Sequence, residues 1–289
     1  MTAQPPDPML PPPVLLQCRD KTLDLSRPVV MGVVNVTPDS FSDGGSFQTV
    51  EAAVSHGVRL AAEGAALIDV GGESTRPGAE PVAPAEELRR VVPVIERLRA
   101  ATSAVISVDT SKPEVMRAAL AAGAGLVNDV YALRAPGALQ AVAGSGCALC
   151  LMHMQGEPRT MQAAPHYADV VGEVRAFLAE RVAACRAAGV EPQRIAIDPG
   201  FGFGKTLEHN LTLLRHLREL TVPGLPVLVG LSRKSMVGTL TGCPPGERVN
   251  GSVALAVVAA LGGARIIRAH DVAATVEALQ IVAAVMGRE

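Results

Sequence analysis

Neither sign of charge dominates this sequence of 289 residues, in which 26 Lys and Arg face 28 Asp and Glu for a formal net charge of −2. A protein whose main partner is nucleic acid or an anionic membrane usually carries a basic excess. We therefore expect neither partner.

Long apolar runs are also missing, since none reaches the roughly 18 residues that a membrane span needs. The first residues, MTAQPPDPMLPPP, lack the basic and apolar regions of a secretory signal. These two absences predict a cytoplasmic protein with no membrane partner.

Cysteine is sparse, and its five scattered residues are not a disulfide framework. Cys147 and Cys150 have the spacing of a redox or zinc half-site, but they lie in an apolar run that is typical of a strand. Because strand side chains alternate, the two would point to opposite faces. We expect both to be small core residues.

Aromatic residues number only seven, with no Trp, although 48% of the residues are hydrophobic. A large core is therefore expected to consist mostly of aliphatic side chains. Five aromatics follow predicted strands: Phe41, Phe47, Tyr131, Phe201 and Phe203. They could stack on a flat ligand or pack loops onto the fold, and both interpretations stay open.

The chain begins with a proline-rich stretch, residues 1–13, for which we expect a flexible tail. Two short alternating runs flanking Arg19-Asp20-Lys21 predict a hairpin ahead of the main fold. No linker divides the remainder, so residues 14–289 are predicted to form one domain.

From Val29 onward, short aliphatic runs alternate with longer helical patterns. The predicted strands are 29–36, 67–70, 105–109, 126–130, 148–152, 195–198, 227–230 and 266–268. The predicted helices are 50–63, 85–99, 113–122, 170–188, 207–220, 249–261 and 273–286, with a short one near 137–143. Eight units of about 33 residues indicate an α/β fold, the (β/α)8 TIM barrel with a short N-terminal hairpin extension. A doubly wound open sheet is the alternative, which the unbroken alternation disfavours.

Polar residues stand at or just after the end of every predicted strand: Asn35, Asp69, Asp109, Asn128, His153, Asp198, Lys234 and Arg268. Any one of them could be a turn or helix cap. Because the carboxyl ends of barrel strands meet at one rim, their convergence predicts a polar ligand site. The rim cations Arg76, Lys205, Arg233, Lys234, Arg268 and His270 favour an anionic ligand, such as a phosphate, a pyrophosphate or a carboxylate.

Three motifs that bind phosphate or metal are absent in their usual form. GFGFGKT at 200–206 fails as a Walker A loop because Pro199 stands where glycine is required. HExxH and paired CxxC metal motifs do not occur. A Mg²⁺ ion could still arrive with phosphates and be held by one protein oxygen and several waters.

Taken together, the sequence motifs at the strand ends resemble those of the dihydropteroate synthase family. They are MGVVNVTPDSFSDGG (31–45), IDVGGESTRPGAEPV (68–82), SVDTSKPEVM (107–116), VNDV (127–130), LMHMQGEPRTMQ (151–162), DPGFGFGKT (198–206), LVGLSRKSMVG (228–238) and RAHDV (268–272). The resemblance implies a homodimeric (β/α)8 barrel. It would join 6-hydroxymethyl-7,8-dihydropterin pyrophosphate to p-aminobenzoate, giving 7,8-dihydropteroate and pyrophosphate, and would be a sulfonamide target.

The resemblance also implies roles for individual residues. Asp198, Asp109, Asn128 and Lys234 would bind the pterin, between apolar walls formed by Val130, Met152 and Phe203. A second group, Arg268, His270 and the nearby Ser232, would hold the leaving pyrophosphate, whose Mg²⁺ would be reached by Asn35. The p-aminobenzoate would be framed by Thr75, Arg76, Pro77 and Ser235. Lys234, Arg268, His270 and Asp109 would be the catalytic residues.

The chemistry that this implies is a dissociative displacement at the pterin methylene carbon. Pyrophosphate can leave when its charge is neutralised, and the weakly nucleophilic aniline needs positioning more than deprotonation. The loops 36–47 and 71–84 are rich in Gly, Ser, Thr and Pro, so we expect lids that exclude water.

Two alternative functions are compatible with the same barrel fold. A methyltransferase using methyltetrahydrofolate would keep Asp109, Asn128 and Asp198 but has no need for STRPG, SRKS and RAH. A non-catalytic pterin-binding paralogue would be expected to lose pyrophosphate residues, whereas Asn35 and Arg268 are both in place.

Overall fold

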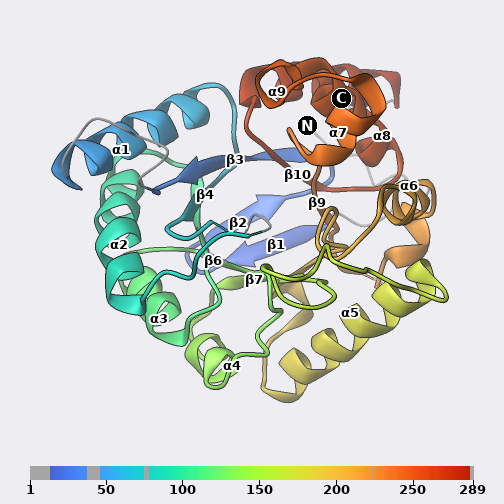
Figure 1. Ribbon diagram of the computed structural model, residues 1–289. Helices are drawn as coiled ribbons and strands as arrows, with labels where there is room; N and C mark the ends of the chain where they lie inside the picture. Colours follow the sequence, from blue (N-terminus) through green and yellow to red (C-terminus); the bar gives the residue numbers. More distant parts are fainter. Residues whose placement is uncertain (1–13, 38–45, 75–77, 223, 287–289) are drawn as a thin grey trace, which may run out of the picture.

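Eight parallel strands form the centre of the molecule, and helices form a ring around them (Figure 1). The computed structural model describes residues 14–37, 46–74, 78–222 and 224–286. The strands are β3 (Val29–Asn35), β4 (Leu67–Gly71), β5 (Val105–Asp109), β6 (Leu126–Asp129), β7 (Ala148–Met152), β8 (Ile195–Asp198), β9 (Leu228–Gly230) and β10 (Ile266–Ala269). A parallel bridge between Ile197 and Val227 joins the two ends of the sheet. The predicted barrel is therefore confirmed, and the open sheet is wrong.

The helices of the described residues lie close to the predicted ranges. They are α1 (Ser46–Ala62), α2 (Pro84–Ala101), α3 (Pro113–Ala121), α4 (Ala138–Val142), α5 (Val170–Ala187), α6 (Leu207–Arg215), α7 (Ser235–Thr241), α8 (Val249–Leu261) and α9 (Val272–Val285), with 3-10 turns at Pro192–Arg194, Leu217–Leu220 and Pro245–Glu247. The helix predicted over 207–220 splits into α6 and a 3-10 turn. The seven-residue α7 was not predicted, because two turns are too few for a periodic pattern.

The predicted hairpin is present as β1 (Leu15–Cys18) and β2 (Lys21–Asp24), which are seen at the centre of the helix ring in Figure 1. Its buried side chains Leu16 and Cys18 pack with one cluster of residues from the first positions of the barrel strands. That cluster contains Met31, Leu67, Val105, Leu126, Ala148, Ala196, Leu228 and Ile266. The hairpin therefore plugs the amino-terminal end of the barrel with apolar contacts.

Alternation along each strand determines what lies inside the barrel. On β5, the apolar Val105 belongs to the plug, and Ser107 and Asp109 follow on the same side at a spacing of two. The outward side chains, such as Val108 and Leu149, join the larger core beneath the helices. The interior is thus apolar at the plugged end and polar at the carboxyl end.

Cys147 and Cys150 are core residues, as predicted. Cys147 belongs to the outer core and Cys150 to the barrel interior, so the two face opposite sides of the sheet. All five cysteines are free thiols, and burial raises the pKa of Cys147 and Cys150. No helix among the described residues combines the length and apolar character required to cross a bilayer.

Candidate active site

The carboxyl ends of the strands bring the predicted polar side chains to one mouth of the barrel. Strand register places Asp109 beside Asn128, and Met152 beside Asp198. Asn128 and Asp198 are 5% and 6% exposed, so each needs partners or a ligand for its polar atoms.

Asp69 is the centre of a buried hydrogen-bond network at this mouth. Its Oδ1 accepts from Ser107 Oγ at 2.6 Å. Its Oδ2 accepts from Asn128 Nδ2 at 3.0 Å and from Arg268 Nε at 2.7 Å. The sequence alone indicates no role for Asp69, because a single carboxylate at a strand end is often a helix cap or a turn residue. Its complete burial is what distinguishes it.

Arg268 also reaches Asp109, because its Nη2 donates to Asp109 Oδ2 at 3.0 Å. Burial raises the pKa of the Asp109 carboxyl, the negative charge of Asp69 raises it further, and Arg268 opposes both. Asp109 is thus a carboxylate whose ionised form depends on a cation beside it.

Asp198 and Lys234 form a second polar group. The Asp198 carboxylate accepts from Gly200 N at 2.7 Å, and burial raises its pKa while Lys234 opposes the shift. Lys234 donates to Phe201 O, and its Nζ lies 4.7 Å from the centre of the Phe203 ring. Burial lowers the pKa of Lys234 to about 8, against the favourable charge of Asp198.

An apolar wall lies beside these groups. Val130 and Met152 are buried together with Met154 and Met161, and Phe203 packs against the same cluster. The three predicted wall residues are therefore neighbours. Of the remaining aromatics, Phe201 is fully buried in the core, and Phe41 lies outside the described residues.

Ser232 and His270 meet where β9 and β10 end. The backbone N–H of His270 donates to Ser232 Oγ at 3.2 Å, and Nδ1 of the same histidine lies 3.0 Å from that hydroxyl. Ser235 is the exposed first residue of α7. The segment that follows β9 thus presents Ser232, Lys234 and Ser235 at the mouth.

Asn35 stands at the end of β3, where its register partner is Gly71. A methyl group at Gly71 would lie 3.9 Å from Asn35 Oδ1 and 3.9 Å from Asp109 Oδ2. Because Gly71 has no side chain, a gap remains there beside the side-chain oxygens of Asn35 and Asp109.

Two of the predicted rim cations are engaged elsewhere. Lys205 is 3% exposed and donates to Gly200 O at 2.9 Å and to Phe203 O at 3.0 Å, so it holds the loop after β8 together. Arg233 donates to Asp271, which lies outside the network. Thr75, Arg76 and Pro77, and residues 38–45 of the predicted lids, lie outside the described residues.

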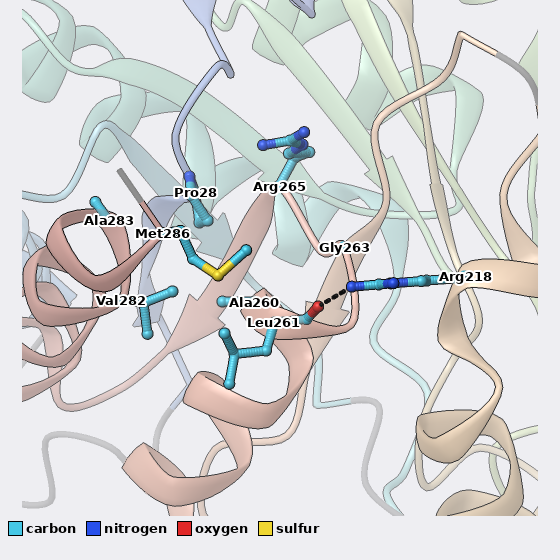
Figure 2. Close-up of a pocket in the computed structure, with 9 residues that line it drawn as sticks. All are labelled: Pro28, Arg218, Ala260, Leu261, Gly263, Arg265, Val282, Ala283 and Met286. Atoms are coloured by element: carbon cyan, nitrogen blue, oxygen red, sulfur yellow. Dashed lines mark hydrogen bonds between the residues drawn. The ribbon is translucent and has the colours of Figure 1, made fainter. Parts of the chain in front are cut away.

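Cavities occur at both ends of the barrel. One of about 170 Å³ opens beside Asp109 and Val130, and Lys112 pairs with Glu73 and Glu87 in its wall. Another, of about 330 Å³, lies at the amino-terminal end between α8, α9 and Pro28 (Figure 2).

The larger cavity is lined by none of the predicted ligand-binding side chains, although two arginines line it. Arg218 donates to Leu261 O at 3.0 Å, a bond drawn in Figure 2, and Arg265 donates to Ser26 O at 2.9 Å. Each guanidinium thus donates to a backbone carbonyl. The predicted ligand side chains are at the other end, and the mouth is the candidate active site.

Known proteins resemble this chain over most of its length. Residues 31–270 match the family of pterin binding enzymes. Dihydropteroate synthase of Escherichia coli strain K12 is 54% identical over 265 residues, which is 92% of this chain and 94% of that protein.

Solved structures agree in fold. Xanthomonas albilineans dihydropteroate synthase with 4-aminobenzoic acid is 60% identical, with a TM-score of 0.90 over 95% of this chain and 98% of that one. Yersinia pestis dihydropteroate synthase in complex with a sulfonamide drug is 54% identical, with a TM-score of 0.90 over 94% of this chain and 99% of that one. This chain therefore belongs to the pterin binding enzymes and, within them, to the dihydropteroate synthases.

Proposed function

We propose that this transferase condenses 6-hydroxymethyl-7,8-dihydropterin pyrophosphate with p-aminobenzoate in folate biosynthesis, giving 7,8-dihydropteroate and pyrophosphate. The observation that carries the proposal is the convergence of Asp109, Asn128, Asp198, Lys234 and Arg268 at one mouth. The purified protein, given both substrates and Mg²⁺, should form a product with the mass of dihydropteroate. Failure to form it, with the protein folded, would overturn the proposal.

Pterin recognition follows from the kinds of atom at the mouth. Asp198 and Asp109 offer carboxylate oxygens to the ring N–H and amino groups, and Lys234 offers a donor to a ring acceptor. Asp198 is buried and Asp109 is mostly shielded from solvent, so their hydrogen bonds to a ligand meet little competition from water. Val130, Met152 and Phe203 supply the flat apolar wall that a heterocycle needs.

Bond cleavage depends on neutralising the leaving pyrophosphate. Arg268 carries a permanent positive charge at the mouth, and His270 with Ser232 lies at the end of the neighbouring strand. As the C–O bond breaks, the electron pair leaves with pyrophosphate and the methylene carbon becomes cationic, with its charge delocalised into the pterin. The aniline nitrogen then attacks that carbon and loses its proton, so no strong general base is required.

The p-aminobenzoate is proposed to lie among Thr75, Arg76, Pro77 and Ser235. The Xanthomonas albilineans enzyme with 4-aminobenzoic acid and the Yersinia pestis enzyme with a sulfonamide drug support this second pocket. Sulfonamides should then inhibit this protein in competition with p-aminobenzoate. Inhibition that excess p-aminobenzoate does not relieve would argue against a shared pocket.

Mg²⁺ is proposed to bind together with pyrophosphate, with Asn35 as the protein ligand. The amide oxygen at the Gly71 gap fits a hard cation, which prefers oxygen ligands and keeps several waters. Within the described residues, no cluster of three or more acidic, His or Cys side chains is arranged to hold a metal. Bound there, the ion would neutralise charge on the pyrophosphate.

Asn35 can be tested separately from catalysis. Isothermal titration should give weaker binding of magnesium pyrophosphate to Asn35→Ala, with unchanged binding of a pterin that has no pyrophosphate. Equal binding of magnesium pyrophosphate to the variant and the parent would reject Asn35 as the ligand.

We also propose a homodimer that forms through α8 and α9. Their outer faces expose apolar side chains: Val258 at 48%, Leu261 at 42%, Ile281 at 64% and Val285 at 77%. An exposed patch of this kind is typical of a protein interface.

A cytoplasmic location is proposed as well, which the free thiols support because a reducing compartment keeps cysteines unpaired.

A further inference from the structure

Both carboxylate oxygens of Asp69 accept hydrogen bonds from protein groups, and two of the donors are residues that the proposed function assigns to ligands. Its side chain is fully buried and accepts three hydrogen bonds, from Ser107, Asn128 and Arg268. A buried carboxylate surrounded in this way is held in one position.

The contact with Asn128 determines which end of that amide is available. Asp69 Oδ2 also accepts from Arg268 Nε, so the Asn128 atom 3.0 Å away has to be the donor, Nδ2. The opposite atom, Oδ1, accepts no hydrogen bond from the residues that the structure describes. Asn128 is thus set to accept from a ligand N–H group.

The contact with Arg268 has a different consequence. Nε is bonded to Asp69, while Nη2 is bonded to Asp109. If a pterin N–H group takes over Asp109, Nη2 is released, but Nε stays on Asp69. The guanidinium then remains at the mouth with its terminal nitrogens directed to an anion.

We propose that Asp69 is a positioning residue that acts through these two contacts. It orients the Asn128 amide to accept from the pterin, and it tethers Arg268 where the guanidinium can bind pyrophosphate. The inference rests on the proposed function, because it assumes that Asn128 and Arg268 bind these ligands.

The experiment measures binding of two separate probes, 6-hydroxymethylpterin and inorganic pyrophosphate, by isothermal titration calorimetry. Asp69→Ala should weaken pterin binding at least tenfold, because the Asn128 amide can then rotate. In an Asn128→Ala background the same substitution should change pterin binding less than twofold. A tenfold loss in both backgrounds would overturn the role of Asp69 in orienting Asn128.

Asp69→Asn provides a second measurement on an isosteric side chain. Its amide oxygen can still accept from Asn128 while the amide nitrogen donates to Ser107, so pterin binding should stay within about threefold. Pyrophosphate binding should fall at least fivefold, because Arg268 loses a charged partner. Unchanged pyrophosphate binding would overturn the proposal that Asp69 tethers Arg268.

Ser107→Ala is the matched control, because it alters the same buried network on the side of Asp69 away from the ligands. Both probes should bind it within twofold of the parent. Thermal unfolding checks that each variant is folded. If the parent forms dihydropteroate while the Asp69 variants bind like the parent, this inference fails alone. If the parent binds neither probe, the proposed function fails.

Discussion

Arg268 donates from Nη2 to Asp109 at 3.0 Å and from Nε to Asp69 at 2.7 Å, so one guanidinium joins the acid proposed for the pterin to a buried acid beneath it. The groups proposed to hold the pterin and the pyrophosphate are therefore in contact before either ligand binds. A substitution at this ion pair should therefore change the binding of both the pterin and the pyrophosphate.

Arg268→Ala should weaken pyrophosphate binding by roughly 2–3 kcal/mol, the usual loss for a hydrogen bond to a charged group. Pterin binding should weaken less, by about 1 kcal/mol, through the higher pKa that Asp109 acquires when its cation is removed. Calorimetry with each ligand alone measures both values, and equal losses would contradict the assignment.

Lys234→Ala should reduce turnover strongly while the fold stays intact. Lys234 lies between Asp198 and the Phe203 ring, and its loss removes a charge-assisted contact of roughly 2–3 kcal/mol. Steady-state rates of dihydropteroate formation, with circular dichroism as the folding check, test this directly. A rate close to that of the parent would show that Lys234 has no catalytic role.

The pH dependence of kcat/KM should be bell-shaped. Asp109 accepts hydrogen bonds when ionised, and because its pKa is raised, the rate should climb with pH until that carboxyl has lost its proton. Burial lowers the pKa of Lys234 to about 8, so the rate should fall above this pH as the ammonium is lost. Lys234→Arg should move the alkaline limb to higher pH, and an unmoved limb would show that another group causes it.

Lys205→Met should destabilise the fold by about 2–4 kcal/mol, because it leaves the buried carbonyl of Gly200 and the partly buried carbonyl of Phe203 without this donor. The matched control is Lys21→Met, which removes a lysine bonded to Ser103 O and Ala104 O near the surface, where water can replace it. Urea unfolding should give a loss under about 1 kcal/mol for the control. Similar losses for the two variants would argue against a special role for Lys205.

Ile281→Lys should convert a dimer into a monomer, because it places a charge in the exposed apolar face of α9. Leu240→Lys is the matched control, since Leu240 is 51% exposed but lies on α7. Light scattering at micromolar concentration gives the mass of each. A monomeric parent protein, or a dimeric Ile281→Lys variant, would reject the proposed interface.

The strands and most helices could be predicted from local patterns, because aliphatic runs of three to seven residues and helical periodicity are properties of neighbouring residues. The polar strand ends could be predicted to share one rim, since parallel barrel strands all point the same way. The seven-residue α7 could not be predicted, because it is too short for a periodic pattern. The plugging position of the hairpin could not be predicted either, because it depends on packing against residues distant in the chain.

The local sequence also does not distinguish the role of Lys205 from that of Lys234. Each follows a barrel strand, but one bonds the carbonyls of its own loop and the other lies at the mouth beside Phe203. Likewise, the Asp69 and Arg268 side chains are 199 positions apart in the chain and 2.7 Å apart in space. Amino-acid order alone thus established the elements and the types of side chain at the rim. Closure of the barrel determined which of these side chains are in contact, because hydrogen bonds and burial depend on distance in space.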